Sequence, residues 1–267
     1  MTADERFALI WNKIERADKH INDLNAVIGT FLASNPYKVA GKKAPQTSQP
    51  IYYLAAIEPV PIEIPTIMGD AIQNLRTALD HLAQQLYLVG SCGASGFRGK
   101  TGFFIASKAS EYRKYVGGKV EGMRHEAIDA LAALEPYKGG KGNDFWTLHC
   151  LNNIDKHRAL VASGSSYAAV NLLPMMAAQM PDVMRQALAN SSMSLFIRPA
   201  NNLCPLKVGD KLLTGAPNTE VEPNMEFKFQ VALNEPGVVE PGPMMEIVQH
   251  LADLVSNTVK AFKPLLA

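Results

Sequence analysis

The amino-acid sequence predicts an α+β fold in which a helical bundle of about five helices has a small antiparallel sheet packed on one side. Apolar residues recur every three or four positions across 4–33 and again across 66–89, as in helices that bury one face. Between 163 and 243, apolar and polar residues alternate in short segments separated by Pro and Gly, which favours antiparallel strands.

The first predicted helix, residues 4–33, has an apolar seam with the spacing of a heptad repeat. Asn35-Pro36 ends it, because the residue before a proline disfavours helical backbone. Such a seam can pack inside a bundle or against the same helix of a second copy. We therefore expect a homodimer through the helix 4–33, with packing inside one chain as the alternative. The seam consists of Phe7, Ile10, Ile14, Ala17, Ile21, Leu24, Ile28 and Phe31.

Local signals predict the remaining elements. Three prolines make 36–50 a predicted loop, and Pro59 and Pro61 end a strand over 51–57. Pro65 is well placed to begin the helix 66–89. The other predicted helices are 124–134, 143–162 (capped by Asn143 or Asp144) and 244–262, and the other strands are 192–198, 207–213 and 226–233.

A chain of this length, with 47% apolar residues, can bury one large core. We expect a single domain over 1–267, in which a helical core (4–162 and 244–262) carries a β-rich insertion (163–243). No stretch reaches about 18 uninterrupted apolar residues, and the N-terminus lacks the order of a signal peptide, so no membrane association is expected.

The charge is balanced overall, with 26 Lys and Arg against 25 Asp and Glu, which argues against wrapping of DNA. Locally it is uneven: 98–141 has nine basic against five acidic residues, and 214–255 has one against seven. A basic face could still meet an anion such as RNA. The cysteines Cys92, Cys150 and Cys204 share no CxxC spacing, which argues against a disulfide framework or structural zinc and fits a cytoplasmic protein.

Two polar clusters interrupt otherwise apolar helices. Arg76, Asp80 and His81 lie in the helix 66–89, and Asp155, His157 and Arg158 lie in the helix 143–162. Polar groups near a core need partners, so a core built only for stability rarely contains them. We therefore expect any chemistry to occur where these two helices meet. The alternative is that the clusters are ion pairs and hydrogen-bonded histidines that fix helix packing.

A helical wheel for 143–162 predicts how the second cluster is oriented. His157 falls on one face with Trp146, Cys150, Ile154 and Val161, so it should be at least partly buried, and more buried than His81. Asp155 and Arg158 are three residues apart and should pair locally. His149 falls on a side expected to be wetter.

The segment Arg76-Thr-Ala-Leu-Asp-His81 resembles the R-x(4–6)-H motif of HEPN ribonucleases, small helical proteins common in bacterial toxin and defence systems. The resemblance implies cleavage of RNA without a metal or other cofactor. Arg76 would bind the phosphate, Asp80 would orient Arg76, and His81 would be the general acid and base, with His157 and Arg158 added from the facing helix. A straight helix separates Arg76 and His81 by about 140°, so a kink or a dimeric site would have to unite them.

Other motifs suggest alternative functions. The run Lys138-Gly-Gly-Lys141-Gly-Asn143 before a helix predicts an anion site of free N–H groups and two lysines, or simply a solvated connection. A non-catalytic protein that binds a small anion or a protein partner is thus an alternative. A metal-dependent hydrolase is another, with ligands from the Asp and His clusters, although no HExxH occurs.

The glycine-rich stretch after residue 89 is not a nucleotide-binding loop. Gly99-Lys100-Thr101 has the end of a P-loop motif, but Ala94 stands where its first glycine belongs. Arg98 and Lys100 remain candidates for contact with a phosphate.

Overall fold

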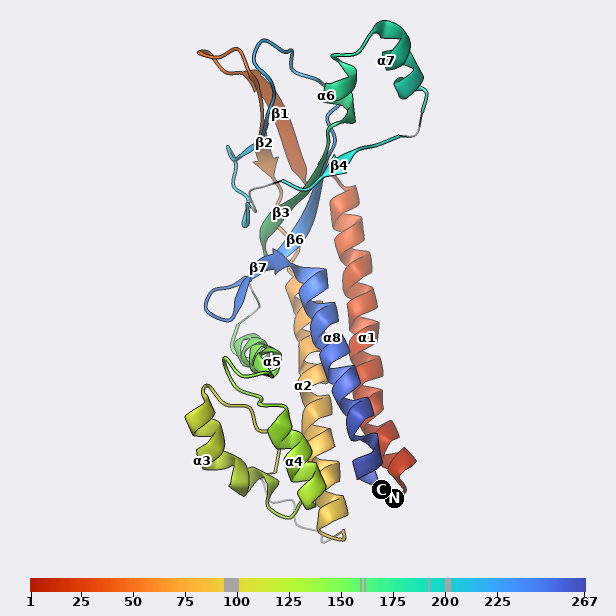
Figure 1. Ribbon diagram of the computed structural model, residues 1–267, viewed down its shortest axis with the longest axis vertical. Coiled ribbons are helices and arrows are strands. Elements are labelled where there is room, and N and C mark those ends of the chain that lie inside the picture. The colour runs from red at the N-terminus through yellow and green to blue at the C-terminus, as the bar shows by residue number, and fades with distance from the viewer. Residues whose placement is uncertain (94–100, 159, 161, 192, 200–202) are drawn as a thin grey trace.

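The structure is a computed structural model that describes residues 1–93, 101–158, 160, 162–191, 193–199 and 203–267. It is α+β, as predicted, with long helices at one end and two antiparallel sheets at the other (Figure 1). The helices are α1 (Ala3–Ala33), α2 (Glu63–Gly90), α3 (Ala109–Val120), α4 (His125–Ala133), α5 (Asn143–Asp155), α6 (Leu173–Ala177), α7 (Asp182–Ala189) and α8 (Met244–Phe262), with a short 3-10 helix, η1 (Lys263–Leu266).

The three long helices α1, α2 and α8 pack along one another. A capping box begins α1: Glu5 N donates to the Thr2 hydroxyl, and Thr2 N donates to the Glu5 carboxylate. The predicted seam of α1 is buried from Ile10 to Phe31, while Phe7 is partly exposed. The seam therefore packs inside one chain, and it gives no support to a dimer through this helix.

Two sheets form the other end. The first has the order β1 (Tyr37–Lys43), β2 (Pro50–Ile57), β5 (Lys211–Thr214), and the second has the order β4 (Phe196–Ile197), β3 (Ala162–Asn171), β6 (Phe227–Glu235), β7 (Val239–Pro243). Neighbouring strands are antiparallel in both sheets. Aromatic rings of the two sheets are in contact, with Tyr52 of β2 against Phe227 of β6 and Tyr37 of β1 against Phe229 of β6. Because β7 leads directly into α8, the second sheet is tied to the helices.

Several predicted boundaries were wrong for physical reasons. The loop predicted over 36–50 contains β1, whose Lys- and Gly-rich sequence becomes a strand because β2 supplies its backbone partners. The helix predicted to run to 162 ends at Asp155, and β3 begins at Ala162. α3, α6 and α7 were not expected. The bundle of about five helices is not confirmed: three long helices form it, and α5 packs against α2 and α8.

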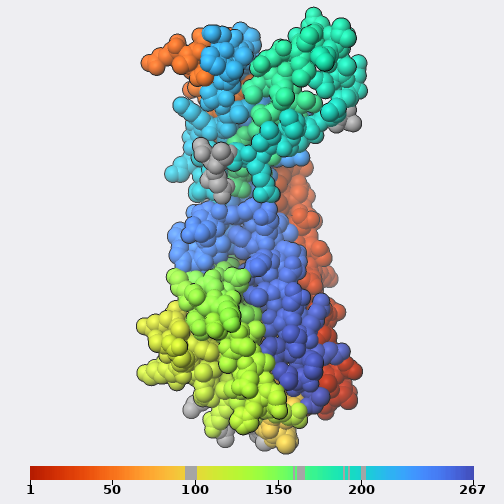
Figure 2. All heavy atoms as spheres, viewed as in Figure 1, coloured from red at the N-terminus to blue at the C-terminus, as the bar shows by residue number. Residues whose placement is uncertain are grey.

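Helices α6 and α7 form an arm that projects beyond the sheets (Figure 2). Neither helix contributes a buried residue among those described. The exposed apolar side chains of the arm include Met176, Val183 and Met184. None of the helices in the described ranges has both the length and the apolar character needed to cross a bilayer.

Candidate functional site

The two helices that carry the polar clusters do meet, and one of their contacts is at a glycine. The carboxylate of Asp155, at the end of α5, lies directly over Gly69 of α2, in the space that a Cβ atom would occupy. Burial, together with the neighbouring carboxylate of Asp70, raises the pKa of Asp155. The lack of a side chain at Gly69 thus lets α5 bring an acidic group against α2.

Arg76 and Asp80 hold the backbone of Phe103. Arg76 Nη2 donates to the Phe103 carbonyl at 3.0 Å, and Phe103 N donates to Asp80 Oδ1 at 3.1 Å. Arg76 Nη1 lies 2.8 Å from Asp80 Oδ1 as an ion pair, although its N–H bonds do not point at that oxygen. Only 11% of the Arg76 side chain is exposed. The hexapeptide of the HEPN resemblance therefore has a structural role, because two of its side chains hydrogen-bond the backbone of a buried phenylalanine.

Phe103 in turn covers α5. Its ring packs on Phe145 with the centroids 5.3 Å apart, and both side chains are buried. Phe145 and His149 are four residues apart, so they lie on the same face of α5. The segment around Phe103 thus encloses a side of α5 that the wheel predicted to be wetter.

His149 is the titratable group that this enclosure perturbs. Burial, with the positive charges of Arg76 and Lys156, lowers the pKa of His149, and Asp80 opposes them. One ring nitrogen, Nε2, lies 3.0 Å from Asn153 Nδ2. The other, Nδ1, is buried and has no hydrogen-bond partner among the described residues, and the same is true of Asn152 Oδ1. The uncharged form of the imidazole is therefore favoured at this junction, because burial and the charges of Arg76 and Lys156 act together.

Arg76 and His81 do not meet within one chain. α2 is a continuous helix from Glu63 to Gly90, with no kink to reduce their separation of about 140°. Arg76 turns toward Phe103, whereas His81 is partly exposed on the flank that also carries Gln85. The Gln85 side chain accepts a hydrogen bond from Arg6 of α1 at 2.8 Å. A site that combines Arg76 with His81 would need two copies of the chain.

The second polar cluster is arranged differently from the prediction. His157 lies beyond the end of α5 and is exposed, so the expectation that it is more buried than His81 was wrong. Arg158 does not pair with Asp155. Instead Arg158 donates two hydrogen bonds to Glu235 of β6, at 3.0 and 2.7 Å. The Glu235 side chain is only 1% exposed, so this pair anchors the exit of α5 to the second sheet.

The free N–H groups expected in the glycine-rich connection 137–143 are already occupied. Gly139 N donates to Asn143 Oδ1 at 3.0 Å, and Lys141 N donates to the Glu135 carboxylate at 3.3 Å. The Lys138 ammonium lies 4.5 Å from the ring centroid of Trp146. Asn143 closes the loop and does not cap α5, whose N-cap is Gly142. The physical basis for an anion site at this helix start is therefore absent from the described contacts.

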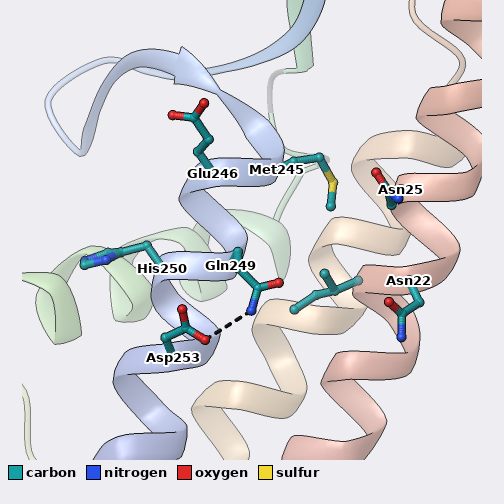
Figure 3. A pocket seen from close by; sticks show the side chains of 8 residues that line it. Asn22, Asn25, Met245, Glu246, Gln249, His250 and Asp253 are labelled. Atoms are coloured by element: carbon teal, nitrogen blue, oxygen red, sulfur yellow. Dashed lines mark hydrogen bonds between the residues drawn. The ribbon is translucent and has the colours of Figure 1, made fainter.

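A groove between α1 and α8 is open but has the wrong charge for an anion (Figure 3). Its volume is about 570 Å³, and Figure 3 shows Met245 and Gln249 reaching from α8 toward Asn22 and Asn25 of α1. Gln249 donates to Asp253 at 3.1 Å, while His250 turns away to Asp144 of α5, 2.7 Å distant. Burial and the carboxylates of Asp253 and Glu15 raise the pKa of the nearby Asp18. A phosphate would be repelled there.

No group of three or more His, Cys, Asp and Glu side chains that could hold a metal occurs in the described part of the chain. The three cysteines are free. Arg98 and Lys100 lie outside the described residues. Comparisons with models of known protein families, with curated proteins and with solved structures found no match for this chain.

Proposed function

We propose that this chain is a cytoplasmic, metal-independent ribonuclease whose cleavage site lies at the junction of α2 and α5. The observation that carries the proposal is the position of His149 on α5, where Asn153 holds Nε2 at 3.0 Å and the charges of Arg76 and Lys156 act on the imidazole, so that its pKa is lowered. An uncharged imidazole is ready to accept a proton, and two adjacent cations favour the negative charge that develops on a phosphorane.

The residues would then have distinct roles. Because Nδ1 is buried, Nε2 of His149 takes the proton of the ribose 2′-hydroxyl as the 2′-oxygen attacks phosphorus, and it returns that proton to the departing 5′-oxygen as the P–O bond breaks. The products are a 2′,3′-cyclic phosphate and a free 5′-hydroxyl. Lys156 is exposed and can reach a phosphate, whereas Arg76 is nearly covered and acts as a positioning residue that keeps His149 uncharged.

This proposal makes His149, instead of His81, the general acid and base, and it keeps the chemistry implied by the R-x4-H resemblance. Within one chain, His149 is the histidine close enough to Arg76 for their charges to interact. The arrangement with His81 stays possible only across two copies. Light scattering tests it directly, because a mass near 29.0 kDa at micromolar concentration leaves no second chain to complete the site.

The test is cleavage of a single-stranded RNA in EDTA, with the products identified by mass spectrometry. His149→Gln should reduce the rate by about 10²–10⁴-fold, the usual contribution of a general acid or base. His125→Gln is the matched control, because His125 is exposed at the start of α4 and should leave the rate unchanged. Acidification should lower the wild-type rate as His149 becomes protonated, at a lower pH than a free histidine requires, because its pKa is lowered. Absence of cleavage in any buffer would refute the proposal.

A non-catalytic role is the second candidate, and one observation favours it. Arg76 and Asp80 satisfy both the N–H and the carbonyl of Phe103, which is how a purely structural pair behaves. Under this alternative, Arg76→Lys should lower the melting temperature, since a lysine cannot reproduce the planar guanidinium contact, and RNA should remain uncut by the wild type.

A further inference from the structure

A cavity lies between the two sheets, and none of the polar residues at the junction of α2 and α5 lines it. Its volume is about 570 Å³, within the range of about 300–1,000 Å³ typical of ligand pockets. Strands of both sheets line it: β3 contributes Tyr167 and Val170, and β5 contributes Lys211 to Thr214. The cavity is thus a product of the way the two sheets face each other.

The walls are apolar, and the polar groups are few. Val170, Leu172 and Leu212 are among the apolar lining residues. Arg198 and Lys211 add two positive charges, both on exposed side chains, and the described residues of the lining include no carboxylate. A cavity of this kind suits a molecule that has an apolar body and one anionic group, because the cations can meet the charge while the walls cover the body.

Tyr167 adds an unsatisfied hydrogen-bonding group. Its side chain is only 3% exposed, and its hydroxyl has no hydrogen-bond partner among the described residues. Burial raises the pKa of Tyr167 to about 12, so the hydroxyl keeps its proton and remains a donor. The hydroxyl oxygen itself has almost no accessible surface, so a ligand in the cavity does not reach it, and Tyr167 contributes to the cavity wall through its other atoms.

We propose that this cavity binds a small amphipathic anion, with its apolar part between the sheets and its charged group at Arg198 and Lys211. A carboxylate and a phosphate monoester share this chemistry. The site is separate from the junction of α2 and α5, so neither proposal depends on the other.

Calorimetric titration of the full chain with decanoate, decyl phosphate, decanol and decylammonium tests the proposal. Decanoate or decyl phosphate should bind with one molecule per chain, and the tighter of the two identifies the head group. Decanol should bind at least about tenfold more weakly, and decylammonium should not bind. Failure of both anions to bind, or equal binding of decanol, would overturn the proposal.

Variants locate the site. Lys211→Ala and Arg198→Ala should each weaken binding of the anion by about three- to tenfold, and both side chains are exposed, so the fold should persist. Lys207→Ala is the matched control, because Lys207 is an exposed lysine nearby that does not line the cavity. Unchanged affinity in the Arg198 and Lys211 variants would contradict the assignment.

Discussion

His149 sits beside Arg76 and Lys156, and burial adds to their positive charges in lowering the pKa of its imidazole. The unfolded chain has no such environment, so its histidine titrates near pH 6.5. Below that pH the unfolded chain binds more protons at this position than the folded chain does. Acidification therefore favours unfolding, and the contribution of His149 to stability is lost as the pH falls.

We predict that the free energy of unfolding of the wild type falls more steeply between pH 7.5 and 5.5 than that of His149→Gln. Urea unfolding followed by circular dichroism at several pH values measures both slopes. His125→Gln, at an exposed position, should keep the wild-type slope. Identical slopes for all three proteins would mean that the imidazole is not buried beside cations.

Glu235 is almost completely buried and accepts two hydrogen bonds from Arg158, whose side chain is 52% exposed. We predict that Arg158→Ala lowers the denaturant concentration at the unfolding midpoint, because it removes two hydrogen bonds from a buried carboxylate. The neighbouring His157→Ala is the control and should change the free energy of unfolding by less than about 0.5 kcal/mol, because His157 is exposed. Denaturant titration of both variants decides between pairing of Arg158 with Glu235 and the arrangement predicted from the helical wheel, in which Arg158 pairs with Asp155 and His157 is buried.

At the scale of elements, α2 and α5 depend on the missing side chain at Gly69. Alanine is the better helix former by about 1 kcal/mol, so an isolated α2 would gain from Gly69→Ala. In the folded protein the new methyl group would meet the Asp155 carboxylate. We predict a net loss of about 1–3 kcal/mol, measured by thermal or urea unfolding.

A double-mutant cycle makes that prediction specific. In an Asp155→Ala background the obstructing carboxylate is gone, so Gly69→Ala should cost much less or become stabilising. The coupling between the two changes should exceed about 0.5 kcal/mol. If the two effects are additive, the contact between Gly69 and Asp155 does not determine how closely α2 and α5 pack.

The sequence predicted the elements whose apolar spacing alone determines their burial. α1, α2 and α8 follow their stripes closely, because each buries one continuous face. The end of α5 could not be predicted from neighbouring residues, because no proline or glycine directly follows Asp155. The residue that anchors it, Arg158, is held by Glu235, which is distant in the sequence. The enclosure of His149 depends on Phe103, another distant contact. Contacts of this kind join segments that are distant in the sequence, so local sequence patterns do not predict them.

The whole molecule consists of a rigid helical end, a sheet end and an arm. The arm, α6 and α7, buries none of its described side chains and contributes little to the core. We predict that replacing 175–190 with a short Gly-Ser linker changes the free energy of unfolding by less than about 0.5 kcal/mol. A large loss of stability in denaturant titration would show that the arm supports the sheets.

The order of the elements along the chain has a consequence for biosynthesis. α1 and α2 leave the ribosome early, but the helix that completes their packing, α8, follows about 150 residues later. At translation rates of about 5–20 residues per second, the apolar stripes of the nascent pair stay partly uncovered for roughly 8–30 s. Chaperones that bind apolar segments have their opportunity in that interval, and folding of the helical end is complete only after α8 has been made.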